Sequence, residues 1–135
     1  MLVTKEQTVP VQAEQDVVKV RQIARQWAEE LRFSLVDQTK LVTAASELAR
    51  NTVTYGGGGN VRLEALNRDN RIGLRLTFED KGPGIPDVNL ALKDGYTTGT
   101  GLGLGLGGAK RLVNDFEIQS KPGEGTRVAI VRWRP

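Results

Sequence analysis

The sequence predicts an α+β domain in which helices pack on one face of a mixed, largely antiparallel sheet. Two stretches, 17–31 and 35–55, carry apolar residues at helical spacing, and shorter stretches alternate apolar with polar residues as strands do. Turns rich in Gly, Pro and Asn join neighbouring strands into hairpins. One strand, two helices, a hairpin, a helix and a second hairpin form a pattern typical of this class. No internal repeat or boundary is visible, so we expect one domain over residues 1–135.

The N-terminal elements are predicted to be a strand and a helix. Residues 2–11 are rich in Val and Thr and contain Pro10 near their end, which favours an edge strand. Glu14 and Asp16 follow, and acidic residues favour the first turn of a helix. The apolar face of this helix comprises Val20, Ile23, Ala24, Trp27, Ala28 and Leu31. We expect an amphipathic helix that packs on the core.

The second predicted helix covers residues 35–55. Ser34 is suited to cap its N-terminus, and Asp37 stands where the acid of a capping box would stand. The apolar side comprises Leu41, Ala45, Leu48 and Thr52, and an adjoining face comprises Lys40, Ala44, Glu47, Asn51 and Tyr55. Gly56 to Gly59 end the helix, because Gly readily adopts the left-handed conformation of a C-cap. Four glycines exceed what a cap needs and indicate close approach or mobility.

Glu47 and Asn51 lie one helical turn apart and point the same way. Their oxygens, together with ligand phosphates, would suit Mg²⁺, which often takes only one or two protein ligands. Alternatively, Glu47 pairs with Arg50 at i+3 on a solvated surface, a common arrangement that contributes about 0.2–0.5 kcal/mol. The residues alone leave both interpretations open, and the surface pair is the more common one.

The hairpin after this helix is predicted to end at an acidic residue. Val61, Leu63 and Ala65 mark its first strand, and residues 67–70 turn the chain into the second. Ile72, Leu74, Leu76 and Phe78 alternate with polar residues, and Asp80 continues this inward series. A carboxylate on the core side is costly unless donors meet its charge. Gly82 and Gly84 would then let a flat ligand lie close, although Asp80 could instead begin a solvated turn.

The second glycine cluster runs from Gly99 to Gly108 and precedes a helix expected at about 104–115. Bare N–H groups at such a helix start favour phosphate. A flexible glycine linker is the alternative, but the regular Gly-Leu alternation is unlike a Gly/Ser linker. The dinucleotide fingerprint fails because no strand precedes the cluster, and a P-loop fails because Ala109 precedes Lys110. The cluster is therefore a different kind of phosphate cradle.

A second hairpin closes the chain. Phe116, Ile118 and Ser120 mark one strand, residues 122–125 form a Pro-Gly-Glu-Gly turn, and the last strand is marked by Thr126, Val128 and Ile130.

Composition excludes several kinds of chemistry. The chain has no Cys and no His, which excludes disulfides, thiolate and His metal sites, a Ser-His-Asp triad and a His phosphoacceptor. The net charge of +3 is spread over scattered Lys and Arg residues and aromatic rings are few, so we do not expect nucleic acid as a partner. No apolar run reaches the length of a membrane span, and the start lacks a signal peptide's apolar core. We expect a soluble, cytoplasmic protein with no membrane partner.

Four short motifs occur in a fixed order that resembles a known superfamily. They are Glu47-x-x-x-Asn51, Asp80-x-Gly82-x-Gly84, Gly101-x-Gly103-x-Gly105 and Gly125-Thr126. This set resembles the GHKL ATPases and kinases, which share the two-layer Bergerat ATP-binding fold. The segments SELARN, EDKGPGIPD, GLGLGLGGAKRLVNDF and GEGT look most like the small serine/threonine kinases of the anti-sigma-factor group, above all the stressosome switch kinases of the RsbT type.

The resemblance implies a role for each motif. Glu47 would be the catalytic residue, acting as general base toward the acceptor hydroxyl or orienting it, and Asn51 would bind Mg²⁺. Asp80 would accept a hydrogen bond from the adenine amino group, with Thr126 assisting beside the ring. The remaining residues implied to bind ATP are Gly82, Gly84, Gly101, Leu102, Gly103 and Gly105, and residues 93–103 would form a lid.

The resemblance also implies partners. It suggests an ATP- and Mg²⁺-dependent serine/threonine kinase that phosphorylates STAS-domain proteins of a stressosome-like complex and activates a PP2C-type phosphatase by binding it. The alternative is an anti-sigma factor that sequesters a sigma factor and phosphorylates an anti-anti-sigma antagonist; a third possibility is a nucleotide-sensing adaptor without transfer chemistry. Sigma-sequestering relatives usually carry His four residues after the motif Asn, whereas this chain has Tyr55. That departure favours the switch kinase.

Overall fold

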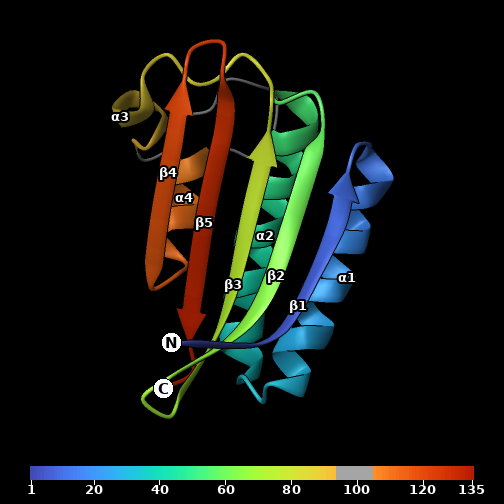
Figure 1. Ribbon diagram of the computed structural model, residues 1–135, viewed down its shortest axis with the longest axis vertical. Coiled ribbons are helices and arrows are strands. Elements are labelled where there is room, and N and C mark those ends of the chain that lie inside the picture. The colour runs from blue at the N-terminus through green and yellow to red at the C-terminus, as the bar shows by residue number, and fades with distance from the viewer. Residues whose placement is uncertain (94–104) are drawn as a thin grey trace.

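The computed structural model describes residues 1–93 and 105–135. Its elements are, in chain order, β1 (Leu2–Val11), α1 (Glu14–Glu30), α2 (Leu35–Thr54), β2 (Gly59–Arg68), β3 (Arg71–Asp80), α3 (Val88–Ala91), α4 (Gly105–Arg111), β4 (Asp115–Lys121) and β5 (Gly125–Trp133). The strands form one layer, and α1, α2 and α4 form a second layer behind it (Figure 1). The predicted α+β class with helices on one face is confirmed.

The sheet has five strands in the order β1-β2-β3-β5-β4. Every pairing among the described residues is antiparallel, so the sheet is antiparallel rather than mixed. The strand at 2–11 lies at one edge, as predicted, and its register shifts between Val3 and Lys5. Such an irregularity twists an edge strand and hinders pairing with another chain.

The β2–β3 hairpin sets the position of Asp80. Asp69 and Asn70 both have positive φ, 52° and 66°, which is the conformation of the two-residue turn that suits the twist of a hairpin. The register from Arg68↔Arg71 to Gly59↔Asp80 follows from this turn. On its other side β3 pairs with β5, and Asp80 stands opposite Thr126.

The core lies between the sheet and the helices. The predicted stripe of α2 is buried throughout, as are most residues of the α1 face, while Ile23 and Leu31 are partly buried against the same cluster. On β3, the predicted alternation places Leu74, Leu76 and Phe78 in the core. Among the described residues, no helix combines the length and the apolar character that a membrane span requires.

The other face of the sheet carries polar and aromatic side chains. Arg75 Nε donates to Glu64 Oε1 over 2.9 Å, and Arg62 Nε lies 3.5 Å from the same oxygen. The hydrogen bond from Arg75 holds the pKa of the Glu64 carboxyl below its ordinary value. Trp133 packs over Gly73, with the guanidinium groups of Arg68 and Arg71 5.0 and 5.2 Å from the ring centre.

Two expectations need correction. The helix expected at about 104–115 ends at Arg111, because the Asn114 N–H donates to the Val131 carbonyl over 2.9 Å and Asp115 already belongs to β4. Its expected start, residue 104, lies outside the described residues.

The second correction concerns the start of α2. Ser34 Oγ accepts a hydrogen bond from the Asp37 N–H over 3.2 Å, so the predicted N-cap is confirmed. The Asp37 carboxylate, however, does not complete a capping box. It accepts a 2.6 Å hydrogen bond from Arg132 Nη2 of β5 instead.

Candidate functional site

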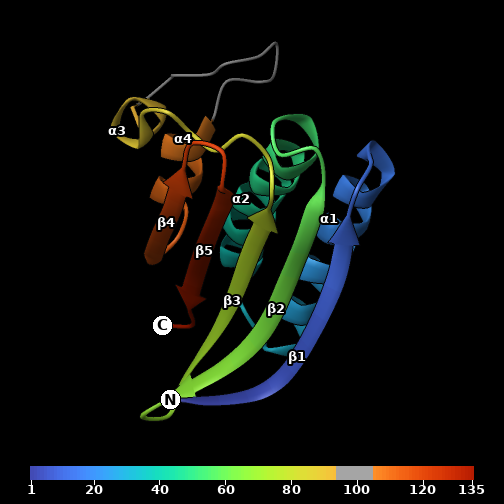
Figure 2. The same cartoon turned by 45° about the horizontal axis from the view of Figure 1, so that its top comes forward.

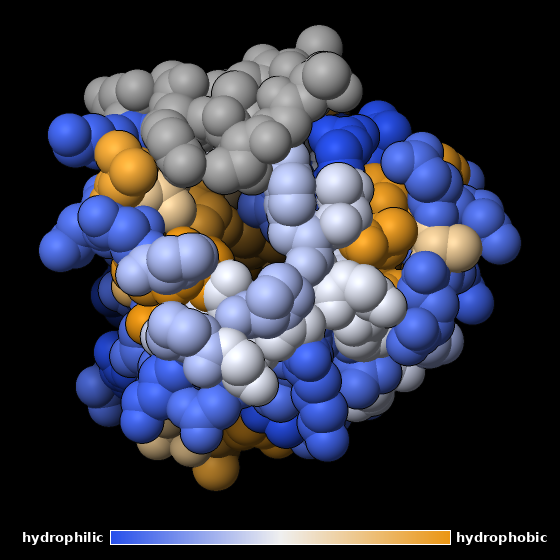
Figure 3. Space-filling view, turned by 90° about the horizontal axis from the view of Figure 1, so that it is seen from above, coloured by the Kyte–Doolittle hydropathy of each residue, from blue (hydrophilic) through white to orange (hydrophobic). Residues whose placement is uncertain are grey.

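A cleft of about 810 Å³ opens at one end of the molecule, between the C-terminal half of α2, the ends of the central strands and the helices α3 and α4. Figure 2 shows these elements meeting at the same end. Seen from above, the cleft is a recess with an apolar interior (Figure 3). Six of the residues predicted for the site line it: Glu47, Asn51, Asp80, Gly84, Gly105 and Thr126. The structure therefore brings these six residues together in one cleft.

Asp80 is the last residue of β3 and faces the cleft, rather than beginning a solvated turn. Its Oδ1 accepts a hydrogen bond from the Gly82 N–H over 2.9 Å. This contact satisfies part of the carboxylate's need for donors, as expected for a partly buried charge. The strand pairing on both sides of Asp80 leaves its backbone little freedom.

The glycines around Asp80 are needed because other parts of the chain pack closely against them. A side chain at Gly56 would overlap the Asp80 carboxyl group, and a Cβ on Gly82 would lie 2.8 Å from Gly56 Cα. Gly84 has a φ of +77°, and a Cβ there would collide with the Lys121 carbonyl. The close approach predicted for residues 56–59 is thus confirmed at Gly56. Gly82 packs beside the cleft rather than lining it.

Thr126 is oriented by Ser120. Ser120 Oγ donates to the Gly125 carbonyl (3.1 Å), accepts from the Ile85 N–H (2.8 Å) and lies 2.9 Å from Thr126 Oγ1. A serine hydroxyl can donate only one hydrogen bond, and Ser120 donates it to the Gly125 carbonyl. The Thr126 hydroxyl is therefore the donor in its bond with Ser120. The lone pairs of Thr126 then remain as acceptors beside Asp80.

Helix α2 forms the opposite wall. Glu47, Asn51 and Tyr55 line the cleft at successive turns, as their spacing predicted. Glu47 is well buried, with 13% of its side chain exposed, and its Oε2 lies 3.7 Å from Arg50 Nη1. That distance exceeds a hydrogen bond. The pairing with Arg50 and the position in the cleft are therefore both present, and neither alternative excludes the other.

The oxygen donors available for a metal come from this wall. Among residues 1–93 and 105–135 there is no group of three or more Asp, Glu, His or Cys side chains that could hold a metal alone. Asn51 and Glu47 fit a Mg²⁺ ion that takes one or two protein ligands and completes its shell with phosphates and water. The donor set is thus compatible with a metal carried in by a phosphorylated ligand.

The remaining predicted residues belong to the glycine cluster. Gly105, with a φ of +59°, and Leu106 line the cleft at the start of α4. Gly101, Leu102 and Gly103, and residues 94–103 of the expected lid, lie outside the described residues. Gly107 has a structural reason to be glycine, because a Cβ there would collide with the Leu92 carbonyl at the end of α3.

Some residues of the cleft were not predicted. Ile85 and Leu90 contribute apolar surface from the segment after Gly84, and Gly56 leaves room for Asp80. Ile85 and Leu90 could have been found because they are apolar residues within a Gly- and Pro-rich stretch. Ser120 could have been found from its inward parity with Phe116 and Ile118. Its partners Gly125 and Thr126 lie in the same hairpin, whereas Ile85 is 35 residues away and could not be identified from the sequence.

Comparison with known proteins agrees with this geometry. Residues 36–134 match the model of the histidine kinase-, DNA gyrase B- and HSP90-like ATPases. The chain is 44% identical over 125 residues to serine/threonine-protein kinase RsbT of Bacillus subtilis, covering 93% of this chain and 94% of that protein. It is 31% identical over 101 residues to an anti-sigma F factor of Bacillus licheniformis, covering 70% and 68% respectively.

Solved structures show the same fold. The RsbU and RsbW domains of a Mycobacterium tuberculosis protein match with a TM-score of 0.66 and 21% identity, over 98% of this chain and 34% of that one. The mycobacterial sensor histidine kinase MprB matches with a TM-score of 0.56 and 20% identity, over 97% and 99%. With the family model, these matches confirm the resemblance seen in the four motifs. The chain belongs to the family of histidine kinase-, DNA gyrase B- and HSP90-like ATPases.

Proposed function

We propose that this protein is an ATP- and Mg²⁺-dependent serine/threonine kinase of the partner-switching type. It phosphorylates STAS-domain proteins of a stressosome-like complex and activates a PP2C-type phosphatase by binding it. The observation that carries the proposal is the placement of Asp80 and Thr126 on one wall of the cleft and of Glu47 and Asn51 on the other. The similarity to RsbT supports the kinase activity, and the resemblance to switch kinases supplies the partner classes.

Adenine fits the strand-built wall. Its amino group would donate to Asp80. Thr126 stands opposite Asp80 in the β3–β5 register, and the lone pairs of its hydroxyl are available as acceptors. The apolar side chains of Phe78 and Ile85 line the cleft and suit the faces of a purine. The cavity volume of about 810 Å³ falls within the usual range for small-molecule sites, about 300–1,000 Å³.

The phosphates would extend toward α2 and the start of α4. Asn51 would bind Mg²⁺ through its amide oxygen, and Gly101, Leu102, Gly103 and Gly105 would hold the phosphate oxygens through backbone N–H groups. Mg²⁺ would neutralise charge on the phosphates. Phosphoryl transfer depends mainly on positioning and on charge neutralisation, which this set of residues can supply.

Glu47 would serve the acceptor hydroxyl. As the γ-phosphorus bonds to the acceptor oxygen, its bond to the ADP oxygen breaks and the hydroxyl proton passes to the Glu47 carboxylate. The burial of Glu47 at the wall of the cleft agrees with this role. Arg50, 3.7 Å away, can balance the Glu47 charge before the acceptor arrives.

Incubation with labelled ATP, Mg²⁺ and candidate STAS-domain proteins tests the proposal. We expect label on a STAS protein, and we expect Glu47→Gln to lower kcat by about 100-fold or more, as loss of a general base does. Asn51→Ala should abolish Mg²⁺-dependent turnover. Wild-type turnover in either variant would overturn the role of that residue. Phosphatase assays with and without the protein test the second partner.

The similarity to an anti-sigma F factor favours one second candidate, a protein that sequesters a sigma factor. A pull-down separates the two functions, because only the sequestering protein retains a sigma factor. Retention of a sigma factor, with no STAS candidate labelled, would replace the first proposal by the second.

A further inference from the structure

Helix α4 is too weak to hold its own position. Gly105, Gly107 and Gly108 are three of its seven residues. An interior glycine is less favourable than alanine in a helix, and isolated helices shorter than about 12 residues are marginal in water. Since Gly105 and Leu106 line the cleft, the position of α4 matters for the site. Contacts with the rest of the chain must supply that position.

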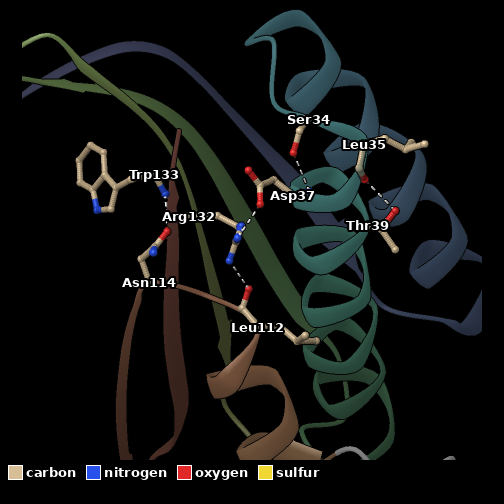
Figure 4. A network of polar contacts seen from close by, with 8 residues as sticks. All are labelled: Ser34, Leu35, Asp37, Thr39, Leu112, Asn114, Arg132 and Trp133. Atoms are coloured by element: carbon tan, nitrogen blue, oxygen red, sulfur yellow. Dashed lines mark hydrogen bonds and ion pairs between the residues drawn. The ribbon is translucent and has the colours of Figure 1, made fainter. Parts of the chain in front are cut away.

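One such contact lies at the C-terminal end of α4. The Leu112 carbonyl, just after the helix, accepts a 2.9 Å hydrogen bond from Arg132 Nη1 (Figure 4). The Leu112 N–H in turn donates to the Ala109 carbonyl over 3.1 Å. Carbonyls at a helix end lack partners within the helix, so a buried guanidinium is an effective partner for them.

The same guanidinium also holds α2. Its Nη2 donates to Asp37 Oδ1 over 2.6 Å, and Figure 4 shows Arg132 reaching from β5 to lie between the two helices. Only 14% of the Arg132 side chain and 12% of the Asp37 side chain are exposed. A planar guanidinium can make both bonds in a fixed geometry, which a lysine ammonium cannot.

Both helices that Arg132 joins line the cleft at their far ends. Asp37 lies in the first turn of α2, and Glu47 follows ten residues later, about 15 Å along the helix at about 1.5 Å per residue. Neither Arg132 nor Asp37 lines the cleft. The adenine side does not depend on this contact, because Asp80 and Thr126 are held by strand pairing.

From this arrangement we infer that Arg132 and Asp37 are positioning residues for phosphate binding. They hold α4, with the cleft-lining Gly105 at its start, in place relative to Glu47 and Asn51 on α2. The inference rests on the proposed function, because it takes the cleft to be an ATP site.

Calorimetric titration with ATP and with adenosine tests this, because adenosine lacks the phosphates. Arg132→Gln should weaken ATP binding about tenfold and leave adenosine binding within about twofold of wild type. The KM for ATP should rise by the same factor. Asp37→Asn, which keeps the bond to Leu112, should weaken ATP binding by about threefold.

Arg75→Gln is the matched control. It removes a 2.9 Å hydrogen bond to the buried Glu64 on the face of the sheet opposite the helices, and it leaves the contacts of Arg132 intact. Both affinities should stay unchanged in this variant, even where its thermal unfolding temperature falls. Circular dichroism shows whether each variant is folded, and if Arg132→Gln is not, Asp37→Asn carries the test.

Several outcomes would overturn the inference. Equal losses for ATP and adenosine in Arg132→Gln, no loss for either ligand, or the same loss in Arg75→Gln would each do so while leaving the proposed function intact. Failure of the wild-type protein to bind ATP would overturn the proposed function, and the inference with it.

Discussion

The two ends of the cleft are built in different ways. At the end proposed to bind adenine, Asp80 and Thr126 lie on adjacent strands, and Asp80 is also paired with Gly59 of β2. At the end proposed to bind the phosphates, Gly105 and Leu106 belong to a short glycine-rich helix that no strand ladder supports. The first end is set by backbone hydrogen bonds and the second by a few side-chain contacts.

This difference indicates a division of labour. Central strands open only with much of the fold, whereas elements with few supporting contacts open at lower free energy. The adenine base would therefore bind to a preformed surface. The phosphates would bind to a part of the chain that can adjust as substrate binds and product leaves. Three measurements can break or sharpen this comparison.

The largest effect is expected at the strand-built end. Asp80→Asn puts N–H donors where the adenine amino group needs an acceptor, so ATP and adenosine should both bind about 100-fold more weakly. The remaining amide oxygen can still accept from the Gly82 N–H, which should preserve the fold. Calorimetry with both ligands measures the effect. Normal ATP binding by this variant would remove Asp80 from the adenine site.

An intermediate effect is expected at the helix-built end. In Gly107→Ala, the new methyl group collides with the Leu92 carbonyl, so α4 must shift away from α3. We expect ATP affinity to fall about tenfold and adenosine affinity to change little. A parallel loss of adenosine binding would show that the two ends are not independent.

The smallest effect is expected when the pH is lowered, and it concerns the stability of the fold. The hydrogen bond from Arg132 lowers the pKa of Asp37 from its ordinary 3.8, and the hydrogen bond from Arg75 lowers that of Glu64 from 4.5. A carboxyl with a depressed folded-state pKa stabilises the fold above its unfolded pKa, and this contribution is lost as pH falls.

The free energy of unfolding should therefore decrease as pH falls below about 4.5, and Asp37→Asn and Glu64→Gln should each flatten that decrease. Denaturant titrations at several pH values measure it. Lys40 and Ser34 also favour the charged form of Asp37, and Arg62 favours that of Glu64. If the free energy of unfolding decreases with falling pH as steeply in a variant as in the wild type, the carboxyl removed in that variant does not contribute to the decrease.

Local patterns were enough to predict most elements. Helical spacing identified α1 and α2, Ser34 marked the start of α2, and strand parity placed Asp80 on the inner side of β3. These signals depend on neighbours within a few residues, which a sequence displays directly. Glu47, Asn51 and Thr126 were assigned to a site through the resemblance of the four motifs, and the structure brings them to one cleft.

Contacts between remote segments could not be predicted. Arg132 and Asp37 are 95 positions apart, and nothing in the pattern around either residue identifies the other. The end of α4 was misplaced because Asn114 pairs with Val131, a partner from another element. Gly107 belonged to a cluster interpreted as a phosphate cradle, whereas its neighbour is the backbone carbonyl of Leu92, just after α3.

The two tryptophans provide built-in optical reporters. Trp27 on α1 lies under Lys5 and donates to Gln7, whereas Trp133 follows Arg132 and donates through its indole to Asp115. Neither ring lines the cleft, so a nucleotide cannot quench either one by stacking on it. A change in emission on adding ATP would report a rearrangement near β4, β5 and the end of α4 or within α1. Variants that keep only one of the two tryptophans would show in which of these two regions the rearrangement occurs.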